Sequence, residues 1–272
     1  MIQTIQEMLS FSFINRAILV GSLISLCAAL LGVSLVLKRY SNIGDGLSHV
    51  GFGISTIAVA FGLSPLYISI PGVIVIAVLL LKLGNNHKIK SDSAIALISS
   101  SALAIGVAVT SLTTGMNTDV CNFMFGSILA MSMSDVILSI IVSIIVLILF
   151  FVYYRKLFAV TFDEDFATAI GLNKNRYTNL IAILTAVIIV IGMRMMGTLL
   201  ISSIIIFPAL TAMRLCKSYK NVVISSGVIS IVCFLVGIFL SYVYNISTGA
   251  TIVLVNLVIF LLFTLIGKII KE

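Results

Sequence analysis

Residues 134–154 read SDVILSIIVSIIVLILFFVYY, with Asp135 near the amino end as the only charged residue. A helix needs roughly 20 consecutive apolar residues to cross a bilayer, so this stretch is long enough to span one. The whole chain has the same character, since 61% of its residues are hydrophobic and 9% are charged, with a mean hydropathy of +1.28. About a quarter of the residues in a soluble domain are charged. The composition therefore excludes an ordinary soluble domain.

Apolar runs of similar length recur along the sequence and predict about nine spans, with eight as the lower count. Lipid offers no hydrogen bonds to the backbone, so runs this long and this apolar are expected to be helices. We predict an all-α, polytopic helical membrane protein with a single transmembrane domain over residues 1–272. The expected spans lie at about residues 14–37, 47–63, 65–83, 94–113, 134–154, 178–193, 197–214, 222–244 and 250–267.

Basic residues are distributed unequally between the two sides of the predicted bundle. With nine spans, all of the 16 lysine and arginine residues except Arg16 and Arg194 fall on one side. Cytoplasmic loops carry an excess of lysine and arginine, so we expect the N-terminus outside and the C-terminus in the cytoplasm. Anionic lipid headgroups account for the net charge of +7. The expected partner of this charge is the lipid bilayer and not a nucleic acid.

Asp45 and His49 stand four residues apart within residues 43–51, IGDGLSHVG. Residues at that spacing share one face of a helix. Ionisable groups inside a membrane are costly and mark ion or substrate paths, and imidazole and carboxylate are ligands for borderline divalent ions such as zinc and manganese. We expect a transient metal site or gate at Asp45 and His49, with Ser48 as a weaker ligand. The alternative is a structural hydrogen-bonded pair at a helix start.

Two further features bear on a path through the membrane. The glycine-rich stretch at residues 44–53 could interrupt a helix, which is tolerated beside a cavity, although kinked packing explains the glycines almost as well. On the outer side, Asp119 and Asn122 precede the sequence FMFG, where an incoming cation would first meet the protein. A solvated loop is the alternative for these two residues.

The predicted cytoplasmic segment at residues 161–172 reads TFDEDFATAIGL. Thr161 and Glu164 have the spacing of a capping box. The acidic residues 163–165 then fall in the first helical turn, where the helix dipole favours negative charge. Gly171 stands where a left-handed C-terminal cap is expected. The pattern predicts one helix of two to three turns.

This predicted helix has an apolar face formed by Phe162, Phe166, Ala169 and Ile170. An isolated helix this short is marginal in water, so it needs a surface to lie on. We expect it to dock on a cytoplasmic partner. An amphipathic helix that lies on the lipid headgroups is the alternative.

Several stretches, taken in order, resemble the ABC-3 family of membrane permeases, which import divalent transition metals. The resemblance covers nearly the whole chain, and the order of the stretches makes it specific although each one alone is weak. The matching stretches are residues 44–49 (GDGLSH), 92–96 (DSAIA), 122–130 (NFMFGSILA), 162–167 (FDEDFA) with 171–172 (GL), 197–212 (GTLLISSIIIFPALTA) and 247–255 (STGATIVLV).

The resemblance implies an ABC importer permease fold and the transport subunit of an ATP-driven importer in a bacterial cell membrane. It implies a homodimer with a second permease copy, two cytoplasmic ATPase subunits and an extracytoplasmic metal-binding protein. The sequence has no G-x-x-x-x-G-K-[ST] loop for nucleotide phosphates, so ATP hydrolysis is expected on a separate chain. The segment 161–172 would be the coupling helix, with contacts to the ATPase from Phe162, Asp163, Glu164, Phe166, Ala169 and Gly171.

The expected cargo is zinc, carried as a substrate, and no permanently bound cofactor is expected. Residues 48–53 (SHVGFG) look slightly more like the zinc-importing members than the manganese importers, which often read SHAVLPG. Import of manganese or iron(II) by the same kind of protein is the alternative. A secondary cation transporter that works without ATP is the other class. Such proteins usually bury more charge at mid-membrane, whereas most acidic residues here stand at loop or helix-end positions.

Overall fold

The computed structural model describes residues 6–8, 10–84, 91–113, 126 and 133–269, which are mostly helical and contain no strand. Two short helices, α8 (Tyr154–Phe162) and α9 (Glu164–Ala169), connect two of the long ones. The predicted all-α architecture is confirmed. The nine long helices within the described residues are α2 (Ser12–Leu37), α3 (Ile43–Ala60), α4 (Pro65–Gly84), α5 (Ser91–Leu112), α7 (Met133–Val152), α10 (Lys174–Met196), α11 (Thr198–Leu215), α12 (Tyr219–Tyr244) and α13 (Thr248–Ile269).

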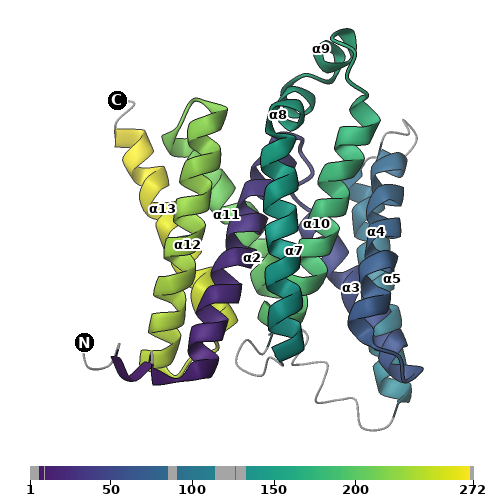
Figure 1. The fold of residues 1–272 in the computed structure, drawn as a ribbon, viewed down its shortest axis with the longest axis vertical. Helices are drawn as coiled ribbons and strands as arrows, with labels where there is room; N and C mark the ends of the chain where they lie inside the picture. The colour runs from purple at the N-terminus through teal and green to yellow at the C-terminus, as the bar shows by residue number, and fades with distance from the viewer. Residues whose placement is uncertain (1–5, 9, 85–90, 114–125, 127–132, 270–272) are drawn as a thin grey trace.

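Eight of these nine helices are long and apolar enough to cross a membrane. The ninth is α3, in which several glycines, Asp45 and His49 dilute the apolar residues. Even so, α3 runs alongside the other helices (Figure 1) and packs against α4, α5, α10 and α11. The described helices therefore agree with the predicted count of eight to nine spans.

The long helices stand side by side and alternate in direction (Figure 1). The first of them, α2, begins at the opposite end of the bundle from the end of α13. The short helices α8 and α9 lie at the same end of the bundle as the end of α13. The segment 161–172 and the carboxyl end of α13 therefore share one side of the bundle.

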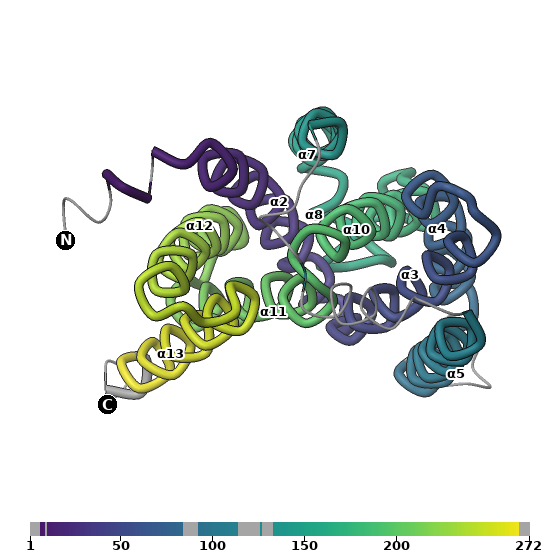
Figure 2. The backbone as a smooth tube through the Cα atoms, turned by 90° about the horizontal axis from the view of Figure 1, so that it is seen from below, coloured from purple at the N-terminus to yellow at the C-terminus, as the bar shows by residue number. Residues whose placement is uncertain are grey.

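The helices differ in how deeply they are buried. In both α2 and α10, which lie near the centre in Figure 2, 72% of the most apolar stretch is buried, whereas the fraction is 17% in α5 and α13 at the rim. A helix that exposes apolar side chains over much of its surface is stable in lipid and not in water. The burial pattern is that of a bundle with a protein core and an apolar outer surface.

Two glycines let α3 approach α5 closely. A Cβ atom on Gly46 would lie 2.7 Å from Ile95 Cγ2, and one on Gly53 would lie 2.5 Å from the Ala102 carbonyl oxygen. Small residues of this kind allow close contact between membrane helices. The helix is continuous through residues 44–53, so the interruption considered for this stretch is absent and these glycines serve helix packing.

Candidate functional site

Asp45 lies in the first turn of α3, and His49 follows one turn later. Their side chains meet, with His49 Nε2 at 3.6 Å from Asp45 Oδ2. The Asp45 side chain is 57% exposed and the His49 side chain is 20% exposed. Because α3 begins at Ile43, before the predicted start of the span at residue 47, helix geometry alone brings this predicted pair together.

Glycines on both sides of Asp45 place it between two neighbouring helices. A Cβ atom on Gly44 would lie 3.2 Å from Ile205 Cδ1 of α11, and one on Gly46 would lie 2.7 Å from Ile95 Cγ2 of α5. Both glycines are buried, whereas Asp45 between them is exposed. The first turn of α3 is therefore wedged against α5 and α11 with only the carboxylate left accessible.

Ser48 has a different environment from the pair. Its side chain is fully buried, and its hydroxyl donates a 2.7 Å hydrogen bond to the Asp45 carbonyl oxygen. Such local bonds are typical of serine within a helix. A metal ion would have to compete with this bond, and with the surrounding core, for the Ser48 oxygen.

The pair offers one imidazole nitrogen and one carboxylate. Zinc takes about four ligands in proteins, so two positions or more are left for other groups. Among the residues that the structure describes, no group of three or more His, Cys, Asp or Glu side chains could hold a metal ion. Asp119 and Asn122, the predicted outer entrance, lie outside the described residues. An imidazole nitrogen and a carboxylate are ligand types that borderline divalent ions accept.

At the other predicted site, the segment 161–172 is divided between two helices. Thr161 and Phe162 end α8, and α9 begins at Glu164 after the extended residue Asp163. The predicted capping box is wrong, because Asp163 is the N-cap and the buried Thr161 Oγ1 has no hydrogen-bond partner among the described residues. Aspartate caps a helix slightly better than threonine, which explains why the start of the helix moves to residue 163.

Local bonds cap both ends of α9. Asp163 Oδ1 accepts hydrogen bonds from two backbone N–H groups of the first turn, at 3.0 and 2.9 Å. At the other end, the N–H groups of Gly171 and Leu172 donate to carbonyls of the last turn, at 3.0 and 2.9 Å. Gly171 has a φ of 82°, so these bonds form a Schellman motif. The left-handed cap predicted at Gly171 is confirmed.

An apolar patch on this segment is exposed. Phe162, Phe166 and Ile170 are 60%, 58% and 54% exposed, and Ala169 is also exposed. Ala167, which lies between Phe166 and Ala169 in the sequence of α9, is fully buried. We call Phe162, Phe166, Ala169 and Ile170 the apolar patch, and these are the residues of the predicted apolar face. Exposed apolar patches of soluble surfaces mark interaction sites.

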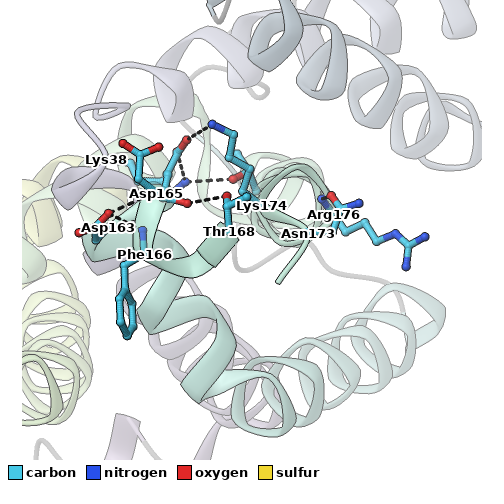
Figure 3. A network of polar contacts seen from close by, with 10 residues as sticks. Lys38, Asp163, Asp165, Phe166, Thr168, Asn173, Lys174 and Arg176 are labelled. Carbon is cyan, nitrogen blue, oxygen red and sulfur yellow. Dashed lines mark hydrogen bonds and ion pairs between the residues drawn. The ribbon is translucent and has the colours of Figure 1, made fainter. Parts of the chain in front are cut away.

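A polar network joins α9 to α2 and α10, and the Phe166 ring points away from it (Figure 3). Lys38 Nζ donates to Glu164 Oε1 at 2.9 Å and to Thr178 Oγ1 at 3.0 Å. Glu164 Oε2 also lies 3.6 Å from Lys174 Nζ. Partial burial alone would raise the pKa of Glu164, but the hydrogen bonds and charges of Lys38 and Lys174 outweigh burial and hold that pKa below its usual value.

Sequence reasoning missed Lys38 and Thr178 as parts of this site. The charge pattern shows Lys38 only as one of many predicted cytoplasmic cations, because 126 residues separate it from Glu164. The one local signal is that Lys38 is the first charged residue after the apolar run of α2.

The chain is similar to known proteins along nearly its whole length. The profile of the ABC 3 transport family matches residues 10–267. The manganese import system permease protein ScaB of Streptococcus gordonii is 32% identical over 94% of this chain and 92% of that protein. The high-affinity zinc uptake system membrane protein ZnuB of Haemophilus influenzae is 28% identical over 93% of this chain and 97% of that protein.

A solved structure of another protein has a similar fold. PsaBC from Streptococcus pneumoniae, in complex with Fab, superimposes with a TM-score of 0.87 and 29% sequence identity, over 97% of this chain and 95% of that chain. The bundle described above therefore has the fold of an ABC importer permease. Because the family profile spans nearly all of the sequence, this multi-pass membrane protein belongs to the ABC 3 transport family.

Proposed function

We propose that the chain is the membrane-spanning permease subunit of an ATP-driven importer of divalent transition metal ions, with zinc as its cargo. The observation that carries this proposal is the pair of Asp45 and His49, a carboxylate and an imidazole in contact at the start of α3. Two of the relatives are named for manganese import and for zinc uptake, which supports a cargo of this class.

The pair acts as a transient site or gate in this proposal. A site with two protein ligands binds an ion less firmly than a closed structural site with four, and a transported ion must be able to leave. The accessible Asp45 carboxylate attracts the cation, and His49 adds a nitrogen ligand. Water or groups from a second permease copy complete the coordination, with Ser48 as a weaker contributor. The imidazole favours zinc, because manganese prefers carboxylate, carbonyl and water oxygens.

The apolar patch is proposed as the surface that couples the permease to a cytoplasmic ATPase subunit. Asp163 and Gly171 hold α9 in shape through its caps, and Glu164 anchors it to the bundle. In this arrangement the end of the bundle that carries α9 and the C-terminus faces the cytoplasm, and the N-terminus lies outside.

The complete transporter in this proposal is a permease homodimer with two ATPase subunits and an extracytoplasmic metal-binding protein. ATP hydrolysis takes place on the ATPase subunits. Asp119 and Asn122 stay a prediction for the outer entrance, where the binding protein would deliver its ion.

The test is the accumulation of zinc, manganese and iron in bacteria that lack their own importers and express this permease with its ATPase and binding protein. We expect the wild type to raise cellular zinc and both Asp45→Ala and His49→Ala to abolish the increase. Asp92→Ala is the matched control, since Asp92 is also an exposed acid in the first turn of a helix. Normal uptake by both variants, at equal amounts of permease in the membrane, would leave the pair structural and remove the basis of the proposal.

Manganese is the second candidate cargo, because the relative named for manganese import is more similar to this chain than the one named for zinc uptake, at 32% against 28% identity. The same experiment separates the two ions. Accumulation of manganese without zinc would reject zinc as the cargo and keep the transporter class.

A further inference from the structure

Lys38 is a buried cation at the point where three helices meet. It is the C-cap of α2, and its side chain is only 5% exposed. Its ammonium group bonds the Glu164 carboxylate at the start of α9 and the Thr178 hydroxyl on α10. A buried charge is strongly unfavourable once its partner is removed. The ion pair with Glu164 therefore stabilises the contact between Lys38 and α9.

The chain that leads from Lys38 to Asp45 is short and held by backbone hydrogen bonds. The N–H groups of Arg39 and Tyr40 donate to carbonyls of the last turn of α2, at 3.1 and 2.9 Å, and form a Schellman motif. The N–H of Ile43, where α3 begins, then donates to the Tyr40 carbonyl at 3.0 Å. Backbone hydrogen bonds thus join the cap of α2 to the first residue of α3, two residues before Asp45.

Arg39 has an unusual backbone conformation in the turn between α2 and α3. Its φ is 61°, in the left-handed region that costs energy for a residue with a side chain. Such a conformation persists only where the surrounding structure enforces it. The turn also lies close to α9, since Lys38 at its start bonds Glu164 at 2.9 Å, and burial and then the charge of Glu164 raise the pKa of the Tyr40 hydroxyl.

We propose that the ion pair between Lys38 and Glu164 transmits movement of α9 to the metal ligands on α3, with Lys38 as a positioning residue. The inference rests on the proposed function, since it takes α9 as the element that the ATPase moves and Asp45 with His49 as the ligands. A displacement of α9 shifts the Lys38 ammonium group, and the hydrogen-bonded turn passes that shift to the first turn of α3. Contiguous hydrogen bonds and rigid elements are the physical means by which sites in a protein are coupled.

Lys174 provides a matched control within the same network. It also faces Glu164, at 3.6 Å, but its side chain is 43% exposed. Exposed ion pairs contribute little, and Lys174 begins α10, which holds neither Asp45 nor His49. Removing the Lys174 charge should therefore leave transmission intact.

The experiment uses the complete transporter in proteoliposomes and measures zinc imported per ATP hydrolysed. Lys38→Met and Glu164→Gln are each expected to lower this ratio by about five-fold, within the range found for residues in a coupling network. The double variant should lower it no further, as residues that act through each other are non-additive. Lys38→Arg, which keeps the charge, should restore part of the ratio, and Lys174→Met should match the wild type.

Thermal unfolding separates transmission from a merely structural role. Glu164→Gln removes the acidic partner of the buried Lys38 and should lower the Tm, whereas in the double variant only the exposed Lys174 lacks that partner and stability should return. The expected result is a double variant that is stable yet still transports poorly per ATP. Recovery of the ratio together with the Tm would overturn the inference.

Other outcomes would also overturn it. A wild-type ratio in Lys38→Met would reject transmission through this pair while the proposed function stands. The ion pair would be required for folding, and not for transmission, if none of three variants reached the membrane: Lys38→Met, Glu164→Gln and the double variant. If the wild-type transporter itself moves no metal, the proposed function fails first, and that result is distinct from the others.

Discussion

The start of α3 and the short helix α9 are built in different ways. Asp45 and His49 come from two successive turns of one helix, and their contact follows from helical spacing. The six-residue helix α9 is instead held by its two caps and by ion pairs to α2 and α10. Loss of either side chain should therefore abolish the proposed metal site, whereas loss of one contact should only weaken the position of α9.

The largest effect is expected for Asp45→Asn and His49→Gln, which keep the size of each side chain. Even substitutions outside the ligand shell of a metal site cost 10–100-fold in affinity or activity, so loss of a ligand should lower the initial rate of zinc uptake by more than about 100-fold. Asp92→Asn is the control. A decrease of less than about three-fold, for which RT ln 3 is below 1 kcal/mol, would assign the pair a structural role.

Phe166→Asp should have the next largest effect, because it places a charge in the centre of the apolar patch. Burial of a phenylalanine side chain is worth roughly 1.5–3 kcal/mol, so binding of the ATPase subunit should weaken by about 10–100-fold. The measurement is the affinity of the purified permease for its ATPase. Phe61→Asp is the control, since Phe61 is 77% exposed and follows α3 at the other end of the helix. Equal ATPase affinity in Phe166→Asp and wild type would remove the patch from the interface.

Gly171→Trp should have a smaller effect on ATPase binding. Apart from its own chain neighbours, no described residue has a heavy atom within 4 Å of the position of a Cβ on Gly171, but the φ of Gly171 is 82°, and a side chain in that region costs roughly 1–2 kcal/mol. Gly171→Asn is the matched variant, because asparagine also occurs as a left-handed cap. If both variants weaken binding equally, the cap conformation is not the cause.

Asp163→Ala should loosen α9 without displacing it. Loss of an N-cap costs about 1 kcal/mol, so amide hydrogen exchange over residues 164–169 should become about five-fold faster. Asp165→Ala, which removes an acid from the first turn but not the cap, should change exchange less. The opposite order of the two variants would reject Asp163 as the cap.

The smallest effect concerns pH. The pKa of Glu164 is held below its usual value, so its contribution to stability is complete above the pKa of the unfolded chain, about 4.3, and is lost as the pH falls through the folded-state value. The Tm difference between wild type and Glu164→Gln should therefore be constant from about pH 6 to 8. It should shrink only in more acidic solution. A difference that changes near neutral pH would require another titrating group.

Local features were predicted well from the sequence. The apolar runs predicted nine helices whose bounds match the structure within four residues, as α10 shows by beginning at Lys174 and not at residue 178. The cap at Gly171 was also predicted, because only a few neighbouring residues are involved in a Schellman motif.

Features that depend on competition or on distant contacts were predicted poorly. Thr161 was expected to cap a helix, but Asp163 offers a stronger acceptor two residues later and the chain uses it. The glycines of α3 left an interrupted helix and close helix packing as alternatives, and only the packed neighbour α5 shows that the helix continues through them. Local propensity shows which residues can break a helix, whereas the neighbouring helix decides whether they do.

The sequence by itself determined the membrane-spanning class, the approximate positions of the long helices and the spacing of Asp45 and His49, because each of these depends on residues close together in the chain. Only the tertiary structure decided that Lys38 meets Glu164 across 126 residues, and that α9 is anchored beside the turn that leads to Asp45. Ion pairs between distant segments depend on the packing of whole helices. The pattern of apolar residues in the sequence does not predict that packing. The contact between Lys38 and Glu164 can therefore be seen only in the folded bundle.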